Sequence, residues 1–178
     1  MRTISRALLY AAPLVAALTL VAGCGGSDGE DSATQWADSV CGSVTTWQSA
    51  VTDAVESVQA SPSRDSVENA VGDVRDATDK LGDDLDEAGK PDTESGDRAK
   101  ETLDELRANL DDGLGTIENA IDDASDTGVL TAVSTVSATL ATMRTQITSA
   151  VDEIEQLDTE GELRSAFSNA DACDDLQK

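Results

Sequence analysis

Apolar residues recur at steps of three and four along most of the chain, and this spacing most limits what the chain can fold into. Four segments carry such a stripe, namely 32–60, 63–88, 99–124 and 129–157. A period near 3.6 residues belongs to an α-helix with one apolar face, whereas a half-buried strand would show alternation. The pattern therefore predicts four long amphipathic helices.

Local signals indicate where these helices begin and end. Ser32, with Gln35 three positions later, is typical of a helix start, and Pro62 ends the first helix. Gly113 and Gly115 each disfavour a helix by up to about 1 kcal/mol relative to alanine. The apolar stripe nevertheless continues across both glycines, so we expect the third segment to be a single helix, straight or bent.

Short connections between long helices favour antiparallel neighbours, so the simplest assembly is an up-down four-helix bundle. After residue 24 the aromatic residues are Trp36, Trp47 and Phe167, and the other apolar residues are mainly Ala, Val and Leu. Such small side chains pack regularly between helices. Trp36 and Trp47 share one stripe and are expected in the core. The predicted fold is all-α, with segment 161–178 forming one or two short helices.

The first 24 residues have the organisation of an export signal. A start with two arginines precedes residues 7–20, which are uncharged and rich in Ala and Leu but shorter than the roughly 20 residues of a membrane-spanning helix. The following Val21-Ala22-Gly23-Cys24 resembles the lipobox of bacterial lipoproteins. The resemblance implies that Cys24 carries acyl chains such as palmitate and becomes the N-terminus. The alternative is an ordinary secretory signal with Cys24 as a free thiol.

The lipobox interpretation divides the chain into three parts. Residues 1–23 are a signal peptide, residues 24–31 a flexible acidic tether, and residues 32–178 one helical domain. Two acyl chains suffice to hold a protein on a bilayer. We therefore expect the protein on the outer face of the bacterial cell membrane, with the membrane itself as a partner through Cys24.

Two cysteines, Cys41 and Cys173, remain once Cys24 is lipidated. Outside the cytoplasm disulfides persist, and two thiols allow a single intramolecular pairing. The residues are 132 positions apart and do not form a Cys-x-x-Cys pair, which speaks against a redox function. The sequence predicts a structural Cys41–Cys173 disulfide that ties the C-terminal tail to the first helix.

Strong negative charge excludes several classes of partner. The net charge is −24, and removal of residues 1–23 would take away Arg2 and Arg6 and no acid, which leaves −26. A surface this acidic repels nucleic acids and anionic headgroups. We expect no nucleic-acid partner and only weak, non-specific cation binding.

Catalytic and metal-binding patterns are missing or incomplete in the sequence. The chain has no histidine, which excludes His-based zinc sites and a Ser-His-Asp triad. The pattern Asp123-x-Ser125-x-Thr127-Gly128 matches the first half of a calcium loop, but its twelfth position is Ser134 where a bidentate Glu is needed. We expect no cofactor, no metal, no catalytic residue and no enzymatic activity.

The fourth segment has an unusual polar face. Between Val129 and Val151 the only charged residue is Arg144, and Ser and Thr supply the other polar positions. This face suits a protein partner, self-association or glycan attachment. The simpler interpretation is a helix flanked on both sides by its neighbours in the bundle.

The chain as a whole resembles the small uncharacterised lipoproteins of actinobacteria. The resemblance rests on the lipobox, the Trp-Ala-Asp-Ser-Val-Cys sequence that starts at Trp36, and the Ala-Cys-Asp-Asp-Leu sequence that ends at Leu176. It implies a location and no chemistry. Our hypothesis is a non-enzymatic structural or protein-interaction module. The alternative is a carrier or sensor of a small apolar ligand or lipid, which the complete Val and Leu stripes disfavour.

Overall fold

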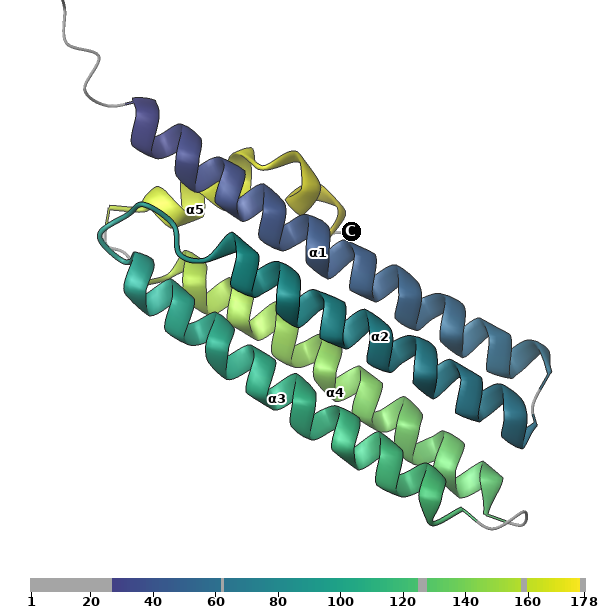
Figure 1. Cartoon of the computed structure of the whole chain (residues 1–178). Coiled ribbons are helices and arrows are strands. Elements are labelled where there is room, and N and C mark those ends of the chain that lie inside the picture. The colour runs from purple at the N-terminus through teal and green to yellow at the C-terminus, as the bar shows by residue number, and fades with distance from the viewer. Residues whose placement is uncertain (1–26, 62, 125–127, 158–159, 177–178) are drawn as a thin grey trace, which may run out of the picture.

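The fold consists of helices that lie side by side in an elongated body (Figure 1). The structure is a computed structural model, and it describes residues 27–61, 63–124, 128–157 and 160–176. Within these ranges no residue lies in a strand, which confirms the all-α prediction. The elements are α1 (Ser27–Ala60), α2 (Arg64–Ala88), α3 (Gly96–Asp122), α4 (Val129–Glu155), α5 (Glu162–Asn169) and the 3-10 helix η1 (Asp171–Asp175).

The long helices form two closely packed pairs. α1 packs against α2 along its length, and α3 packs against α4 in the same way. α2 also contacts α3, whereas α1 and α4 meet at few points. The short α5 and η1 contact mainly α1. The predicted C-terminal tail of one or two short helices is thereby confirmed.

The apolar stripes meet in one continuous core, as predicted. Trp47 is 1% exposed, and its Nε1 donates to Thr78 Oγ1 at 2.9 Å, while Trp36 is 6% exposed and donates to the Gly89 carbonyl at 3.3 Å. Both tryptophans therefore fill the core, as expected. The other large and fully buried side chains are Phe167, Leu81, Leu110, Ile117, Met143, Ile147, Ile154 and Leu163.

One helix start differs from the prediction, and another has a cap that the sequence did not indicate. α1 begins at Ser27, within the segment 24–31 that was expected as a tether, so the start signal at Ser32 lies inside the helix. α2 begins with a capping box that we did not predict. The Ser63 hydroxyl accepts from the Ser66 N–H at 3.1 Å, and the Ser66 hydroxyl accepts from the Ser63 N–H at 2.9 Å. The usual box has Glu or Gln at the fourth position, which is why Ser66 gave no signal.

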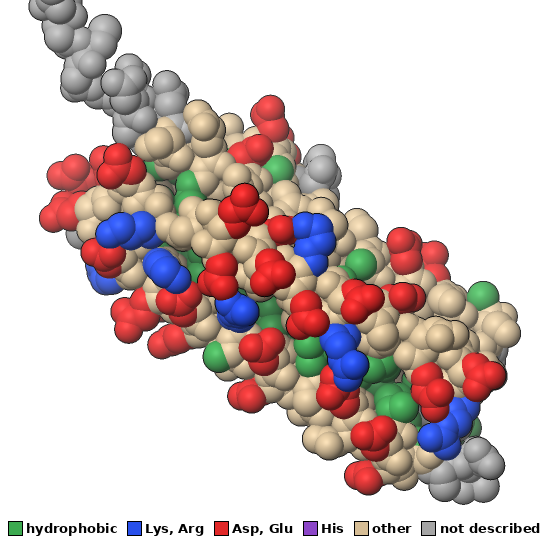
Figure 2. All heavy atoms as spheres, in the orientation of Figure 1, with side chains coloured by type: hydrophobic (Ala, Val, Ile, Leu, Met, Phe, Trp, Pro, Cys, Tyr) green, Lys and Arg blue, Asp and Glu red, His purple; other side chains and the backbone are tan. Residues whose placement is uncertain are grey.

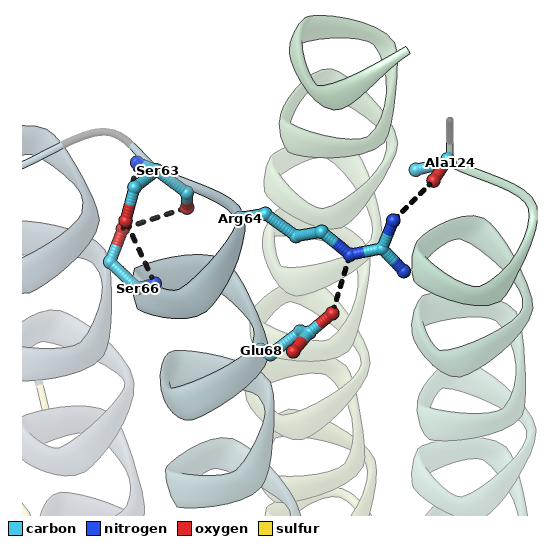
Figure 3. A network of polar contacts seen from close by, with 5 residues as sticks. All are labelled: Ser63, Arg64, Ser66, Glu68 and Ala124. Carbon is cyan, nitrogen blue, oxygen red and sulfur yellow. Dashed lines mark hydrogen bonds and ion pairs between the residues drawn. The ribbon is translucent and has the colours of Figure 1, made fainter. Parts of the chain in front are cut away.

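Polar contacts tie the start of α2 to the end of α3 (Figure 3). Arg64 forms an ion pair with Glu68 at 2.7 Å, one turn further along α2. Its guanidinium also donates to the Ala124 carbonyl, just after α3, at 3.2 Å. A helix end has carbonyls without partners inside the helix, and an arginine from a neighbour satisfies one of them here.

The third segment is one helix that runs through its glycines, as predicted. Gly113 lies close to α4, because a Cβ there would lie 2.9 Å from Met143 Cγ and the Met143 side chain would have to shift. Gly115 has open space around it and no such role. At the start of α3, a Cβ on Gly96 would overlap the Pro91 carbonyl oxygen. Gly113 therefore lets α3 approach α4 closely, and Gly96 lets the start of α3 approach the α2–α3 connection.

Candidate functional site

The structure brings together two of the three predicted site residues. Cys41 of α1 and Cys173 of η1 are both buried and form the predicted disulfide, with an S–S distance of 1.98 Å and a Cα–Cα distance of 5.0 Å. Cys24, the predicted lipid attachment site, lies outside the described residues. The confirmed disulfide closes a chain segment of 132 positions and fixes the C-terminal tail on α1.

Further contacts hold the tail beside the disulfide. The Phe167 ring of α5 packs edge-on against Trp36, with ring centroids 5.8 Å apart and an interplanar angle of 84°. The Asp38 carboxylate accepts a hydrogen bond from the Ala172 N–H at 2.9 Å. An acidic side chain at the start of a short helix satisfies an N–H group that has no helical partner. The tail is therefore a docked part of the fold.

A groove of about 520 Å³ lies beside the disulfide, between α1, α4, α5 and η1. Ile147, Val151 and Phe167 supply apolar side chains, while Glu155 and Arg164 are among its polar ones. The groove follows from the helix pairing, because α1 and α4 meet at few points and α5 covers only part of the space between them. Sequence patterns alone did not predict it.

Glu155 is the acidic residue of this groove with a perturbed pKa. Partial burial raises the pKa of the Glu155 carboxyl, and repulsion from the neighbouring Asp152 carboxylate raises it further. The positive charge of Arg164 opposes both effects by lowering the pKa. The net result is a carboxyl that holds its proton more tightly in the folded chain than in the unfolded one.

We expect Glu155→Gln to reduce the loss of stability with rising pH. When folding raises a carboxyl pKa, the associated stability is fully present below the ordinary pKa and is lost as the pH rises through the raised pKa. A glutamine cannot ionise and does not undergo this loss. Urea denaturation from about pH 4 to about pH 7 should therefore show a smaller decline for Glu155→Gln than for the wild type. Glu153→Gln, at an exposed position on α4, is the control, and an equal decline in both variants would contradict the prediction.

An apolar cavity of about 70 Å³ lies at the end of the bundle away from the disulfide. All four long helices line it, and every lining side chain is Ala, Val, Leu or Ile except Gln59 and Ser137. Two of the core positions are small, Ala54 of α1 and Ala70 of α2. The complete Val and Leu stripes did not indicate this cavity. Buried alanines occur along the whole core, so the sequence alone did not mark the two beside the cavity.

The outward face of α4 is exposed and, over residues 130–151, carries a single charge, Arg144. α4 packs against α3 along its length and meets α1 and α5 at fewer points, so it is not closely flanked on both sides. Leu130, at its start, is 83% exposed. The hydroxyls of Thr142 and Thr145 donate to the carbonyls four residues earlier, at 3.0 Å in each case. The face therefore presents methyl groups and hydroxyl oxygens whose own donors are already satisfied.

The side of the bundle formed by α2 and α3 has the opposite character (Figure 2). Asp and Glu side chains cover it, with Lys and Arg side chains between them. Arg75 of α2 pairs with Glu118 of α3, and Arg107 of α3 pairs with Asp86 of α2. These pairs are exposed, and solvent and salt screen pairs of this kind, so they contribute little to stability. They are the only ion pairs between α2 and α3 among the described residues. Most of the acidic side chains remain without a basic partner, so the surface is strongly negative.

The described part of the chain shows neither a metal-binding group nor a membrane-spanning helix. Among the residues that the structure describes, no three Cys, Asp or Glu side chains form a group that would hold a metal ion. Part of the calcium-loop pattern, residues 125–127, lies outside them. No helix in the described part of the chain is long and apolar enough to cross a membrane.

Comparison with known proteins gave no match. No family model, no curated protein and no solved structure is significantly similar to this chain. The candidate sites therefore rest on the geometry alone, namely the groove at the disulfide, the apolar cavity and the uncharged face of α4.

Proposed function

We propose that the protein is a lipid-anchored, extracytoplasmic and non-enzymatic module that binds another protein of the cell envelope through the outward face of α4. The lipobox-like residues before Cys24 support the location. A single observation carries the proposed binding function, which is the exposed face over residues 130–151 of α4 with one charge, Arg144, in a chain of net charge −24. Asp and Glu side chains are exposed on α1, α2 and α3, whereas residues 130–151 of α4 include none.

The proposed anchor would orient the bundle on the membrane. Ser27, the first residue of α1, is three positions after Cys24, so the lipid and the start of α1 are close together. α1 has 34 residues, and at 1.5 Å per residue its other end is about 51 Å away. We propose an up-down arrangement of the four long helices, supported by the α1–α2 and α3–α4 pairing. The start of α4 then lies far from the membrane, where a partner has access.

The chemistry of this face suits a protein contact. Burying a charge or an unsatisfied hydroxyl donor in an interface costs free energy. On α4 the Thr hydroxyls already donate to backbone carbonyls of the same helix, for example Thr139 to Thr135 at 2.9 Å and Thr148 to Arg144 at 3.1 Å. Covering the face therefore leaves few donors without partners, and the methyl groups gain burial.

We expect Thr142→Glu combined with Thr145→Glu to abolish partner binding. Both residues are exposed on α4, and the two carboxylates would have to be desolvated in an interface. Glutamate is a better helix former than threonine, so the fold should be unaffected. The measurement is photo-crosslinking in the native envelope from a probe at position 138 on the same face, together with the oligomeric state by sedimentation.

A matched control adds the same charge elsewhere. Asn69→Glu combined with Asn119→Glu places two carboxylates at exposed positions of α2 and α3. The proposal requires a discrete crosslinked species that survives in this control and disappears in the α4 variant. The same crosslinking pattern and oligomeric state in both variants would show that the α4 face is not an interface.

A second candidate function is a carrier or sensor of an apolar ligand. The observation that favours it is the cavity between the four long helices, whose lining is apolar apart from Gln59 and Ser137. An apolar cavity does not hold water, because water needs two to four polar partners. A co-purifying compound that native mass spectrometry detects at one equivalent would support this function.

A further inference from the structure

The groove beside the disulfide has the size of a small-molecule site. Its volume is about 520 Å³, and such sites in proteins usually have about 300 to 1,000 Å³. The elements that line it are held in place, because the disulfide joins η1 to α1 and the Trp36–Phe167 contact joins α5 to α1. The groove is therefore preformed, and a ligand does not have to order any of these elements.

The groove has an apolar wall. Ile147 and Val151 of α4, Phe167 of α5 and Leu176 after η1 contribute to it. Val151 and Leu176 are half-buried, so part of their apolar surface is free for a ligand to cover. Removing apolar surface from water is the main favourable contribution to most associations. The wall therefore favours a ligand with an apolar body.

Three charged side chains also line the groove, namely Asp152 and Glu155 of α4 and Arg164 of α5. No ion pair among the described residues includes any of them. Asp152 and Arg164 are exposed and Glu155 is half-buried, so a ligand can reach all three. Asp152 and Glu155 lie one turn apart, and their repulsion contributes to the raised pKa of the Glu155 carboxyl. The groove thus presents an acidic pair and one guanidinium beside an apolar wall.

From this combination we propose that the groove binds an apolar zwitterion, which is a free amino acid with an apolar side chain or a short apolar peptide with free termini. The ligand ammonium pairs with Asp152 and Glu155, and the ligand carboxylate pairs with Arg164. A guanidinium suits a carboxylate because it offers two parallel N–H donors. The apolar side chain of the ligand lies on the wall. The inference is independent of the protein partner proposed above.

Ligands with a single charge fit the groove less well. An anion would approach a chain of net charge −24 and would lie beside two carboxylates, which costs electrostatic free energy. A cation would pair with the acidic residues but would lie near Arg164, whose charge acts on Glu155. A zwitterion offers each of the three side chains a group of opposite charge. It also carries no net charge into the acidic field of the protein.

The test uses the chain with Cys24→Ser and an intact disulfide, so that no acyl chain competes for the groove. Phenylalanine is titrated by calorimetry beside two analogues, 2-phenylethylamine, which lacks the carboxylate, and 3-phenylpropanoate, which lacks the ammonium. We expect phenylalanine to bind at one equivalent and about fivefold more tightly than either analogue, the factor that one partly exposed ion pair supplies. The dipeptide Leu-Phe is titrated in the same way, and the tighter zwitterion identifies the source of the ligand.

Charge variants assign the two contacts. Arg164→Gln should weaken phenylalanine binding about fivefold and should not weaken binding of 2-phenylethylamine. Asp152→Asn combined with Glu155→Gln should remove the preference for phenylalanine over 3-phenylpropanoate. Arg144→Gln and Glu153→Gln are the matched controls, because they remove charges of α4 that do not line the groove. Neither control should change the binding of phenylalanine.

Blocking variants locate the site. Ser168 of α5 and Thr148 of α4 line the groove at exposed positions, so a larger side chain there fills the groove without removing a core contact. Ser168→Trp should abolish phenylalanine binding while the circular dichroism spectrum stays native. Thr148→Trp serves the same purpose from α4.

Three results would overturn the inference. If either analogue binds as tightly as phenylalanine, the zwitterion class is wrong. If phenylalanine binding persists in both blocking variants with native spectra, the site lies elsewhere. If neither phenylalanine nor Leu-Phe binds, the groove is not a site for this class of ligand, and the proposed contact through the α4 face is unaffected.

Discussion

Replacing Cys41 and Cys173 together by alanine is expected to lower the free energy of unfolding by about 2 to 5 kcal/mol. The disulfide joins residues 132 positions apart, and closing so long a segment removes much conformational freedom from the unfolded chain. Alanine is the appropriate replacement because both positions are buried. Urea denaturation followed by circular dichroism measures the change, with the slope reporting whether the unfolded state has expanded.

The folded state of this variant should remain largely native. The Trp36–Phe167 contact and the Asp38–Ala172 hydrogen bond do not depend on the sulfurs and should keep the tail docked under native conditions. Adding a thiol reductant should reproduce the loss in the wild type and have no further effect on the double variant. A stability change below about 1 kcal/mol would show that the unfolded chain is already compact or that tail docking contributes most of the stabilisation.

Local patterns in this chain predicted the features that depend on a single helix or a single pair of residues. The stripe through Val40, Val44, Trp47 and Val51 specifies one helix face, because burying it requires no knowledge of the partner. The disulfide was predictable because two thiols have one pairing. The start of α1 at Ser27 was not predictable from the sequence. Serine is tolerated inside a helix as well as at its start, so Ser32 did not mark the boundary.

The candidate sites depend on how the helices pair, which the stripes do not specify. Each helix presents a similar apolar face, and nothing local indicates that α1 packs closely with α2 and sparsely with α4. This pairing of the helices leaves space for the groove at the disulfide and for the cavity beside Ala54. It also leaves the outward face of α4 uncovered. The unusual composition of α4 was visible in the sequence, but its exposure followed only from the packing.

The core position with the largest expected effect is Trp47, and Trp47→Ala should destabilise the fold by about 3 to 5 kcal/mol. The indole is 1% exposed between α1 and α2, so its removal leaves a cavity in the closest helix pair of the protein. It also removes the donor to Thr78 Oγ1 at 2.9 Å. Thr78 still donates to the Val74 carbonyl at 2.8 Å, so its hydroxyl keeps one of its two hydrogen bonds.

A cycle of variants separates the packing from the hydrogen bond. Trp47→Phe keeps an aromatic ring and removes the donor, so it should cost less than Trp47→Ala. Combined with Thr78→Val, it should show a coupling of about 0.5 to 1.5 kcal/mol, the usual net value of one hydrogen bond. Urea denaturation followed by circular dichroism at 222 nm, where the helix signal dominates, measures all four proteins. If Trp47→Ala lowers the free energy of unfolding by less than about 1 kcal/mol, the prediction is wrong. Such a result would mean that α1 and α2 close over the space left by the ring, and that their packing adjusts more freely than the structure indicates.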